Sequence, residues 1–197
     1  MALELGVLVA DASMLDRALD LMLHVDEAQL FLMDEGVRAA GAPRLLAAID
    51  DGLDASLCAM DAEARGVAPV AGGPRFGSQW DHATMVRDAA RVVAMTGGRI
   101  DDHDGATPGP GRRVALRLTR AASDPKVAQA LRSAVGYAAA NLSVIVVVEP
   151  PARELLRHEG HPPAVVRAIA TLRALGHRFV EVATSNHRVS CDLEVSW

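Results

Sequence analysis

The sequence has few aromatic residues and almost no lysine. Phenylalanine, tryptophan and tyrosine make up 3% of the 197 residues, and Lys126 is the single lysine among 20 basic residues. So few aromatic rings provide no stacking platform for bases or sugars. The formal net charge is -5 and the arginines are spread along the chain, so no basic stripe could neutralise a phosphate backbone. These absences argue against direct nucleic-acid binding.

Long apolar runs and secretion signals are also missing. No apolar stretch approaches the roughly 20 residues of a membrane-spanning helix, and residues 1–10 carry no basic flank or cleavage-type site. The two cysteines, Cys58 and Cys191, lie far apart in the sequence, which is typical of a reducing compartment rather than of a disulfide framework. We therefore expect a cytoplasmic protein with no membrane partner.

Half of the residues are apolar, enough for a sizeable core of mainly alanine, leucine and valine. Short, mainly apolar runs alternate with segments of helical periodicity, and the first run, 5–10, is uninterrupted, as is typical of a strand covered on both faces. The predicted strands are 5–10, 28–33, 55–59, 91–96, 114–118, 143–148 and 179–183, and the alternating pattern of 189–196 predicts a half-exposed edge strand. Helices are predicted between them, for example at 43–49, 60–65, 80–90 and 163–175. This pattern predicts an α/β fold with mostly parallel sheets flanked by helices on both faces.

The order of elements in the first half recurs in the second, which indicates two tandem units. Gly52 precedes Cys58 by six residues, and Gly176 precedes Val182 by the same six, so the second unit lacks the cysteine. Between them, residues 97–112 contain almost no apolar side chain and are rich in glycine and proline. We interpret the chain as a first domain at 1–97, a linker at 98–112 that contributes nothing to a core, and a second domain at 113–197.

Cys58 is the candidate reactive residue of the chain. It ends a predicted strand and precedes a short helix, whose unpaired N–H groups and dipole favour a thiolate. The nearby Asp61 and Glu63 act in the opposite direction, because negative charge raises the pKa of a thiol. Activation would need a cation or an imidazole from Arg38, Arg65 or His82. From the residues alone, Cys58 is either an inert core residue or a reactive thiol.

Three blocks in the first half carry a family resemblance. They are LFLMDEGVRAA at 30–40, ASLCAMDAEARGV at 55–67 and DAARVVAM at 88–95. In this order they resemble the DsrE/DsrF/DsrH family, which includes the Tus sulfur-relay subunits. The resemblance implies that Cys58, followed at family spacing by Arg65 and Gly66, carries a persulfide between a protein sulfur donor and a protein acceptor. It also implies a homo-oligomer or hetero-oligomer and no metal or organic cofactor.

The predicted site lies where the parallel strands end. Carboxyl ends of parallel strands open on one edge of a sheet, so we expect a partly accessible Cys58 facing a pocket rimmed by 34–37 and by a loop at 72–78. The binding residues of this hypothesis are Asp34, Glu35, Gly36, Arg65, Gly77 and Ser78. The histidines show no metal-ligand spacing, so no metal site is predicted. The alternative is a non-catalytic DsrE-like scaffold or a small-ligand-binding module that acts through oligomerisation.

Overall fold

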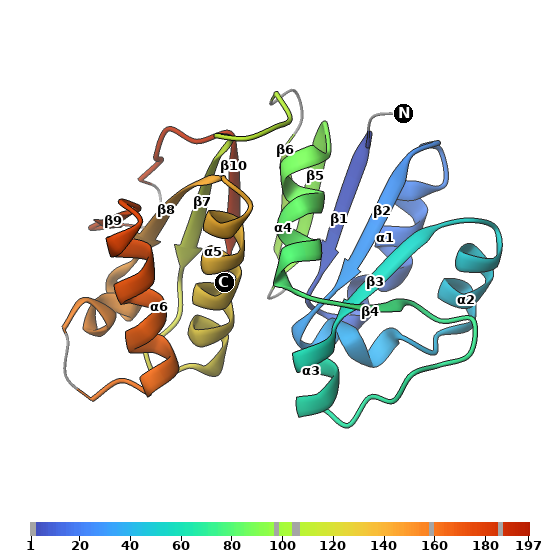
Figure 1. Cartoon of the computed structure of the whole chain (residues 1–197), viewed down its shortest axis with the longest axis horizontal. Coiled ribbons are helices and arrows are strands. Elements are labelled where there is room, and N and C mark those ends of the chain that lie inside the picture. The colour runs from blue at the N-terminus through green and yellow to red at the C-terminus, as the bar shows by residue number, and fades with distance from the viewer. Residues whose placement is uncertain (1–2, 97–98, 104–106, 158–159, 185–186) are drawn as a thin grey trace.

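The computed structural model describes residues 3–96, 99–103, 107–157, 160–184 and 187–197 (Figure 1). The strands are β1 Leu5–Val9, β2 Ala28–Leu32, β3 Asp54–Cys58, β4 Arg75–Gly77, β5 Arg91–Thr96, β6 Arg99–His103, β7 Arg113–Leu118, β8 Ser143–Val148, β9 Arg178–Glu181 and β10 Leu193–Ser196. The α-helices are α1 Leu15–Met22, α2 Pro43–Asp50, α3 Ala59–Ala64, α4 Gln79–Asp88, α5 Pro125–Ala139 and α6 Pro163–Ala174. Short 3-10 helices cover Ala12–Met14, Asp34–Ala39 and Pro150–Leu156. Within the described ranges, no helix is both long and apolar enough to cross a membrane.

The first sheet has the strand order β4-β3-β2-β1-β5-β6, and every neighbouring pair is parallel except β5 with β6. Helices α1 and α2 pack on one face of this sheet and α4 on the other. The central strand β1 is therefore buried along its whole length. This arrangement explains the uninterrupted apolar run of β1, because a strand with helices on both faces has no solvent-facing side.

The second sheet repeats the strand order of the first. Its order is β10-β7-β8-β9, with all pairs parallel, which corresponds to β5-β1-β2-β3 in the first sheet. Helices α5 and α6 cover one face, and α5 lies beside α4 (Figure 1). A helix connects β4 to β5 in the first unit, whereas no helix occurs among the described residues between β9 and β10. The α/β class with mostly parallel, helix-flanked sheets is confirmed.

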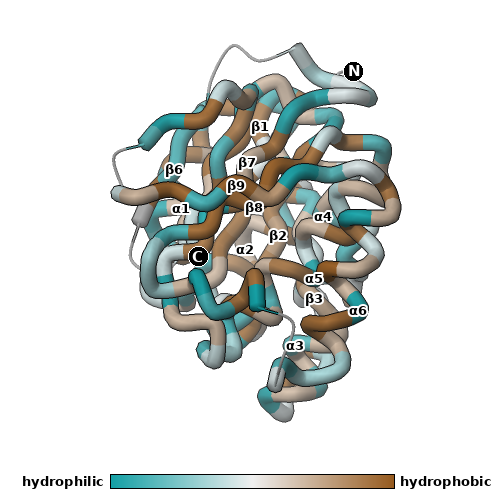
Figure 2. The backbone as a smooth tube through the Cα atoms, turned by 90° about the vertical axis from the view of Figure 1, so that its left-hand side faces the viewer, coloured by the Kyte–Doolittle hydropathy of each residue, from teal (hydrophilic) through white to brown (hydrophobic). Residues whose placement is uncertain are grey.

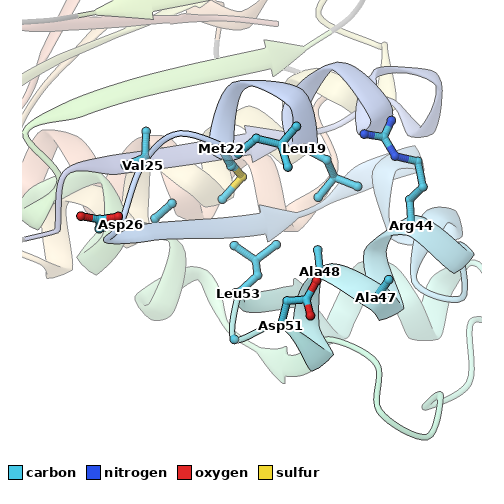
Figure 3. A pocket seen from close by; sticks show the side chains of 12 residues that line it. Leu19, Met22, Val25, Asp26, Arg44, Ala47, Ala48, Asp51 and Leu53 are labelled. Carbon is cyan, nitrogen blue, oxygen red and sulfur yellow. The ribbon is translucent and has the colours of Figure 1, made fainter.

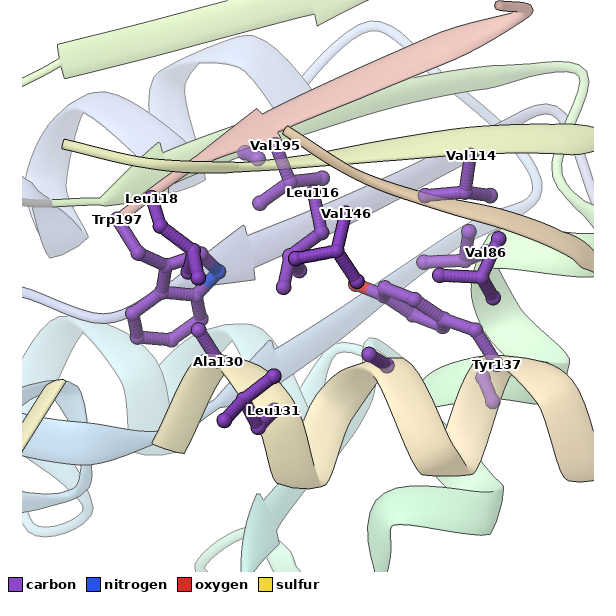
Figure 4. Packing of buried hydrophobic residues seen from close by; sticks show 14 of the residues in the cluster. Val86, Val114, Leu116, Leu118, Ala130, Leu131, Tyr137, Val146, Val195 and Trp197 are labelled. Atoms are coloured by element: carbon purple, nitrogen blue, oxygen red, sulfur yellow. The ribbon is translucent and has the colours of Figure 1, made fainter. Parts of the chain in front are cut away.

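One apolar core joins the two units. The largest cluster of buried side chains includes Phe31 and Val86 from the first unit together with Leu116, Tyr137 and Trp197 from the second. Figure 4 shows the side chains of α5 pointing into this cluster beneath β7, β8 and β10. Along the chain, hydrophobic residues concentrate in the strands at the centre of the molecule (Figure 2). Burial of this shared apolar surface stabilises the contact between the units.

Side chains of β5 and β6 close the free edge of β10. Thr96 Oγ1 donates a hydrogen bond to the Ser196 carbonyl oxygen, and the Ser196 amide donates to Asp101 Oδ2 at 3.0 Å. The His103 Nε2 atom lies 2.8 Å from the Glu194 carbonyl oxygen and 3.1 Å from its amide nitrogen, so its tautomer decides which one it pairs with. These bonds satisfy backbone groups that an edge strand would otherwise expose.

The segment interpreted as a linker is partly structured, and the expectation that it contributes nothing to a core is wrong. Residues Arg99–His103 form β6, and Ile100 packs against the core beneath α1 and α2. At the other end of the segment, Arg112 is buried and its guanidinium donates to the carbonyls of Val86 at 2.8 Å and Ala89 at 2.7 Å. The physical reason is that backbone pairing holds residues 99–103 and polar bonds hold Arg112, so few apolar residues are needed in these described parts.

Candidate functional site

Cys58 ends β3 and is the residue before α3, as the sequence predicts. Its side chain is 1% exposed and belongs to the shared core that also contains Phe31 and Met33. The expectation of a partly accessible cysteine is therefore wrong. Leu57 packs with the core on the α1 and α2 side, and the alternation of a strand turns Cys58 toward the face covered by α4 and α5.

Burial and charge together keep the Cys58 thiol protonated. Desolvation raises the pKa of this thiol, and the negative charge of Asp61 raises it further. The Asp61 backbone N–H and the guanidinium of Arg132 lower the pKa, but these effects are smaller than desolvation. Gln79 Nε2 lies 3.7 Å from the sulfur and donates to it. The start of α3 therefore does not produce the thiolate that the sequence position favours.

Asp61 is the buried centre of the polar contacts around this site. Its side chain is 2% exposed. Oδ2 accepts from the Asp34 amide at 2.9 Å and from Gln129 Nε2 at 2.6 Å, while Oδ1 accepts from Arg132 at 3.0 Å. Gln129 and Arg132 belong to α5 of the second unit, so Asp61 bonds across the contact between the units.

Asp34, Glu35 and Arg65, three of the predicted binding residues, come together as an ion-pair network. The Arg65 guanidinium contacts Asp34 Oδ1 and lies 2.8 Å from Glu35 Oε1. Hydrogen bonds from Arg38 and Arg65 lower the pKa of Glu35. Lys126 of α5 places Nζ 3.2 Å from Asp34 Oδ2. All of these ion pairs join residues of the chain itself, so Arg38 and Arg65 are already paired with carboxylates.

The other three predicted binding residues, Gly36, Gly77 and Ser78, have local structural roles. Gly36 lies against the backbone of Val9, with no room for a side chain. Gly77 belongs to β4, opposite Cys58, so the predicted loop at 72–78 contains a strand. Ser78 caps α4: its hydroxyl accepts from the Trp80 amide at 3.1 Å, and its own amide donates to Asp81 at 2.7 Å.

A buried hydrogen-bond chain leads from the second unit to the cysteine. Tyr137 Oη lies 3.1 Å from His82 Nε2, and His82 Nδ1 lies 3.4 Å from Gln79 Oε1. Because an amide oxygen only accepts, Nδ1 carries the proton, Nε2 accepts from the tyrosine, and the Gln79 amide group donates to Cys58. The His82 ring also stacks on Phe31, with centroids 5.1 Å apart. His82 thus holds Gln79 in place rather than acting on the thiol itself.

Burial lowers the pKa of His82 from 6.5 to about 3. A folded pKa below the unfolded one means that the contribution of the neutral ring is complete above pH 6.5 and is lost as the pH falls toward about 3. As the pH falls from about 6 to about 4.5, the unfolding free energy should decrease by up to roughly 1.4 kcal/mol for each pH unit. Urea unfolding across this range measures the slope.

The matched variants for this slope are His82→Gln and His24→Gln. His24 is exposed, so its replacement should leave the wild-type slope, while His82→Gln should flatten it. Equal slopes in the two variants would contradict the assignment of the acid sensitivity to His82.

The polar residues of α5 that complete the site are not predicted from the sequence. Lys126, Gln129 and Arg132 lie about 70 residues beyond Asp61 in the chain, on a helix whose sequence pattern indicates only amphipathicity. Among the described residues, no group of three or more histidine, cysteine, aspartate or glutamate side chains is arranged to hold a metal ion. The site is therefore a buried thiol surrounded by ion pairs between two units.

No protein-family model, curated protein or solved structure matches this chain. The resemblance to the DsrE/DsrF/DsrH family consequently rests on the three sequence blocks around Asp34, Cys58 and Met95.

Proposed function

We propose that this chain is a non-catalytic DsrE-like scaffold, which acts by binding rather than by carrying sulfur. The observation that carries the proposal is the state of Cys58, which is 1% exposed and has a raised pKa. Persulfide exchange requires a thiolate that the sulfur of a partner can reach. A protonated thiol in the core meets neither condition, so packing is the role that its geometry supports best.

The second unit supports this proposal because its helix α5 lies over the sheet face toward which Cys58 points, and so covers the approach of a partner. Helix α5 packs against α4, and its Gln129 and Arg132 bond to Asp61, three residues after the cysteine. Removing α5 from this position would expose apolar core and leave a buried carboxylate without partners, which is costly. We infer that the tandem arrangement fixes the two units as one binding surface.

A sulfur relay is the second candidate function, and one observation favours it. Cys58 stands at the carboxyl end of β3 and at the start of α3, and Gln79 donates to its sulfur. In the relay, the Cys58 thiolate attacks the outer sulfur of a donor persulfide; a Cys58 persulfide forms, and the donor leaves as its thiolate. This step requires α5 to move away and the thiol to lose its proton.

The proposal also includes an assembly and a location. Two unpaired cysteines suit a reducing compartment such as the cytoplasm.

Three exposed apolar side chains, Met60, Phe76 and Trp80, lie on α3, on β4 and in the first turn of α4. Exposed apolar side chains next to an edge strand support assembly into a homo-oligomer or hetero-oligomer.

The reaction rate of Cys58 with iodoacetamide in the folded protein tests the proposed function. A core thiol should react only when the molecule opens, whereas a relay thiol should react at neutral pH like an accessible cysteine of low pKa. Fast modification of the folded protein would favour the relay over the scaffold.

A further inference from the structure

A pocket of about 420 Å³ lies between the C-terminal ends of α1 and α2, beside the starts of β2 and β3. The pocket therefore lies at the amino ends of the parallel strands β2 and β3, whereas Cys58 lies at the carboxyl end of β3, on the opposite side of the sheet. Leu19, Met22 and Leu53 point into the pocket (Figure 3), and its volume suits a small organic molecule. The adjoining Leu23 is 69% exposed, which extends the apolar surface to the rim.

The charged groups of this pocket favour a cation. Arg44 is its one basic lining residue among those described, and its guanidinium is held by Asp16 at 3.0 Å and Asp20 at 2.6 Å. Asp26 and Asp51 also line the pocket, are exposed, and form no ion pair with any described residue. The charged lining groups that have no ion-pair partner among the described residues are therefore two carboxylates.

The two helix ends add to this preference. Helices α1 and α2 both terminate at the pocket, and neither has a basic residue in its last turn. The final carbonyl groups of a helix carry a partial negative charge that a cation stabilises. At the end of α2 the carbonyls of Ala47, Ala48 and Ile49 already accept backbone amides of residues 51–53, so the helix ends supply a partial negative charge and not free acceptors. This partial charge adds to the charges of Asp26 and Asp51, which stand on opposite sides of the pocket (Figure 3).

We propose that this pocket binds a small organic cation with an apolar body. The protonated amine lies by either Asp26 or Asp51, which stand on opposite sides of the pocket (Figure 3), and the apolar body packs on Leu19, Met22 and Leu53. A ligand with a carboxylate would meet like charge at this rim, and a neutral ligand would gain only the apolar contact. The inference goes beyond the proposed function by naming a site and a ligand class, and a reactive Cys58 would overturn that function without affecting this pocket.

Three probes of similar size test the proposal: n-octylammonium, octan-1-ol and octanoate, titrated into the full-length protein by calorimetry. We expect the ammonium to bind most tightly, the alcohol more weakly, and the carboxylate most weakly. One close charge interaction, the longer-range attraction of the second carboxylate and the helix ends should give the ammonium an advantage over the alcohol of roughly fivefold to tenfold. Equal binding of octanoate and octylammonium would overturn the proposal.

Two variants locate the binding. The double variant Asp26→Asn/Asp51→Asn should remove most of the ammonium advantage and leave octan-1-ol binding unchanged, while Glu63→Gln, which neutralises one exposed carboxylate on α3, should change neither. Ala47 is exposed and lines the pocket, so Ala47→Phe should weaken all three probes without disturbing the fold, as checked by urea unfolding. A folded Ala47→Phe protein that still binds octylammonium at wild-type affinity would place the ligand elsewhere and contradict the site.

Discussion

Replacing Asp61 with alanine should destabilise the protein by about 3 to 5 kcal/mol, the usual cost of breaking a buried charged network. The side chain is 2% exposed and accepts from the Asp34 amide, Gln129 and Arg132. Its loss leaves these donors without their acceptor and breaks the polar contact between the units. Urea unfolding of the variant and the wild type measures the difference in unfolding free energy.

Two further variants separate burial from charge. Glu35 also pairs with Arg65, but its side chain is 46% exposed, so Glu35→Ala should cost about 1 kcal/mol or less. Asp61→Asn keeps an oxygen acceptor and loses the charge, and should fall between the two. If Asp61→Ala is no more damaging than Glu35→Ala, the buried network does not hold the units together.

Replacing Gly36 with alanine should cost about 3 kcal/mol, because the new methyl group has no space. A Cβ at this position would lie 2.2 Å from the Val9 carbonyl oxygen and 2.9 Å from its carbonyl carbon, and neither backbone atom can give way without moving β1. Thermal or urea unfolding measures the loss.

Gly41 provides the matched control for this substitution. A Cβ on Gly41 would meet only Val70 Cγ2, at an ordinary contact distance of 3.8 Å. Gly41→Ala should therefore change the unfolding free energy by no more than about 0.5 kcal/mol. A Gly36→Ala protein as stable as Gly41→Ala would show that Gly36 does not serve close packing and would return it to the predicted binding residues.

The sequence allows most of the fold to be predicted, because the signals involved are local. Strand β1 is an apolar run, its repeat counterpart β7 is largely apolar, and helices such as α5 begin at clear caps. Strands β4 and β6 are missed because Arg75–Gly77 and Arg99–His103 are short and largely polar. Their strand state comes from neighbouring backbone in the folded protein, which no residue pattern records.

The sequence predicts where the candidate site lies, but not whether its side chains are exposed. The ends of β2 and β3 bring Asp34 and Arg65 together near Cys58, as parallel topology requires. Exposure depends instead on the second unit, since Gln129 lies 68 residues from the Asp61 that it bonds. An aspartate after a strand reads as a solvated charge, and only the docking of α5 makes it a buried one.

The alkylation rate of Cys58 is the most direct test of the central claim that this cysteine is a packing residue. A Cys191→Ala protein leaves Cys58 as the single thiol, and a Cys58→Ala protein leaves the half-buried Cys191 for comparison. With iodoacetamide at neutral pH, followed by mass spectrometry, folded Cys58 should react at least about 1,000-fold more slowly than the same thiol in urea, because reaction requires an opening that costs several kcal/mol. A folded Cys58 that reacts at the rate of the unfolded chain, or faster, would contradict the account and favour the sulfur relay.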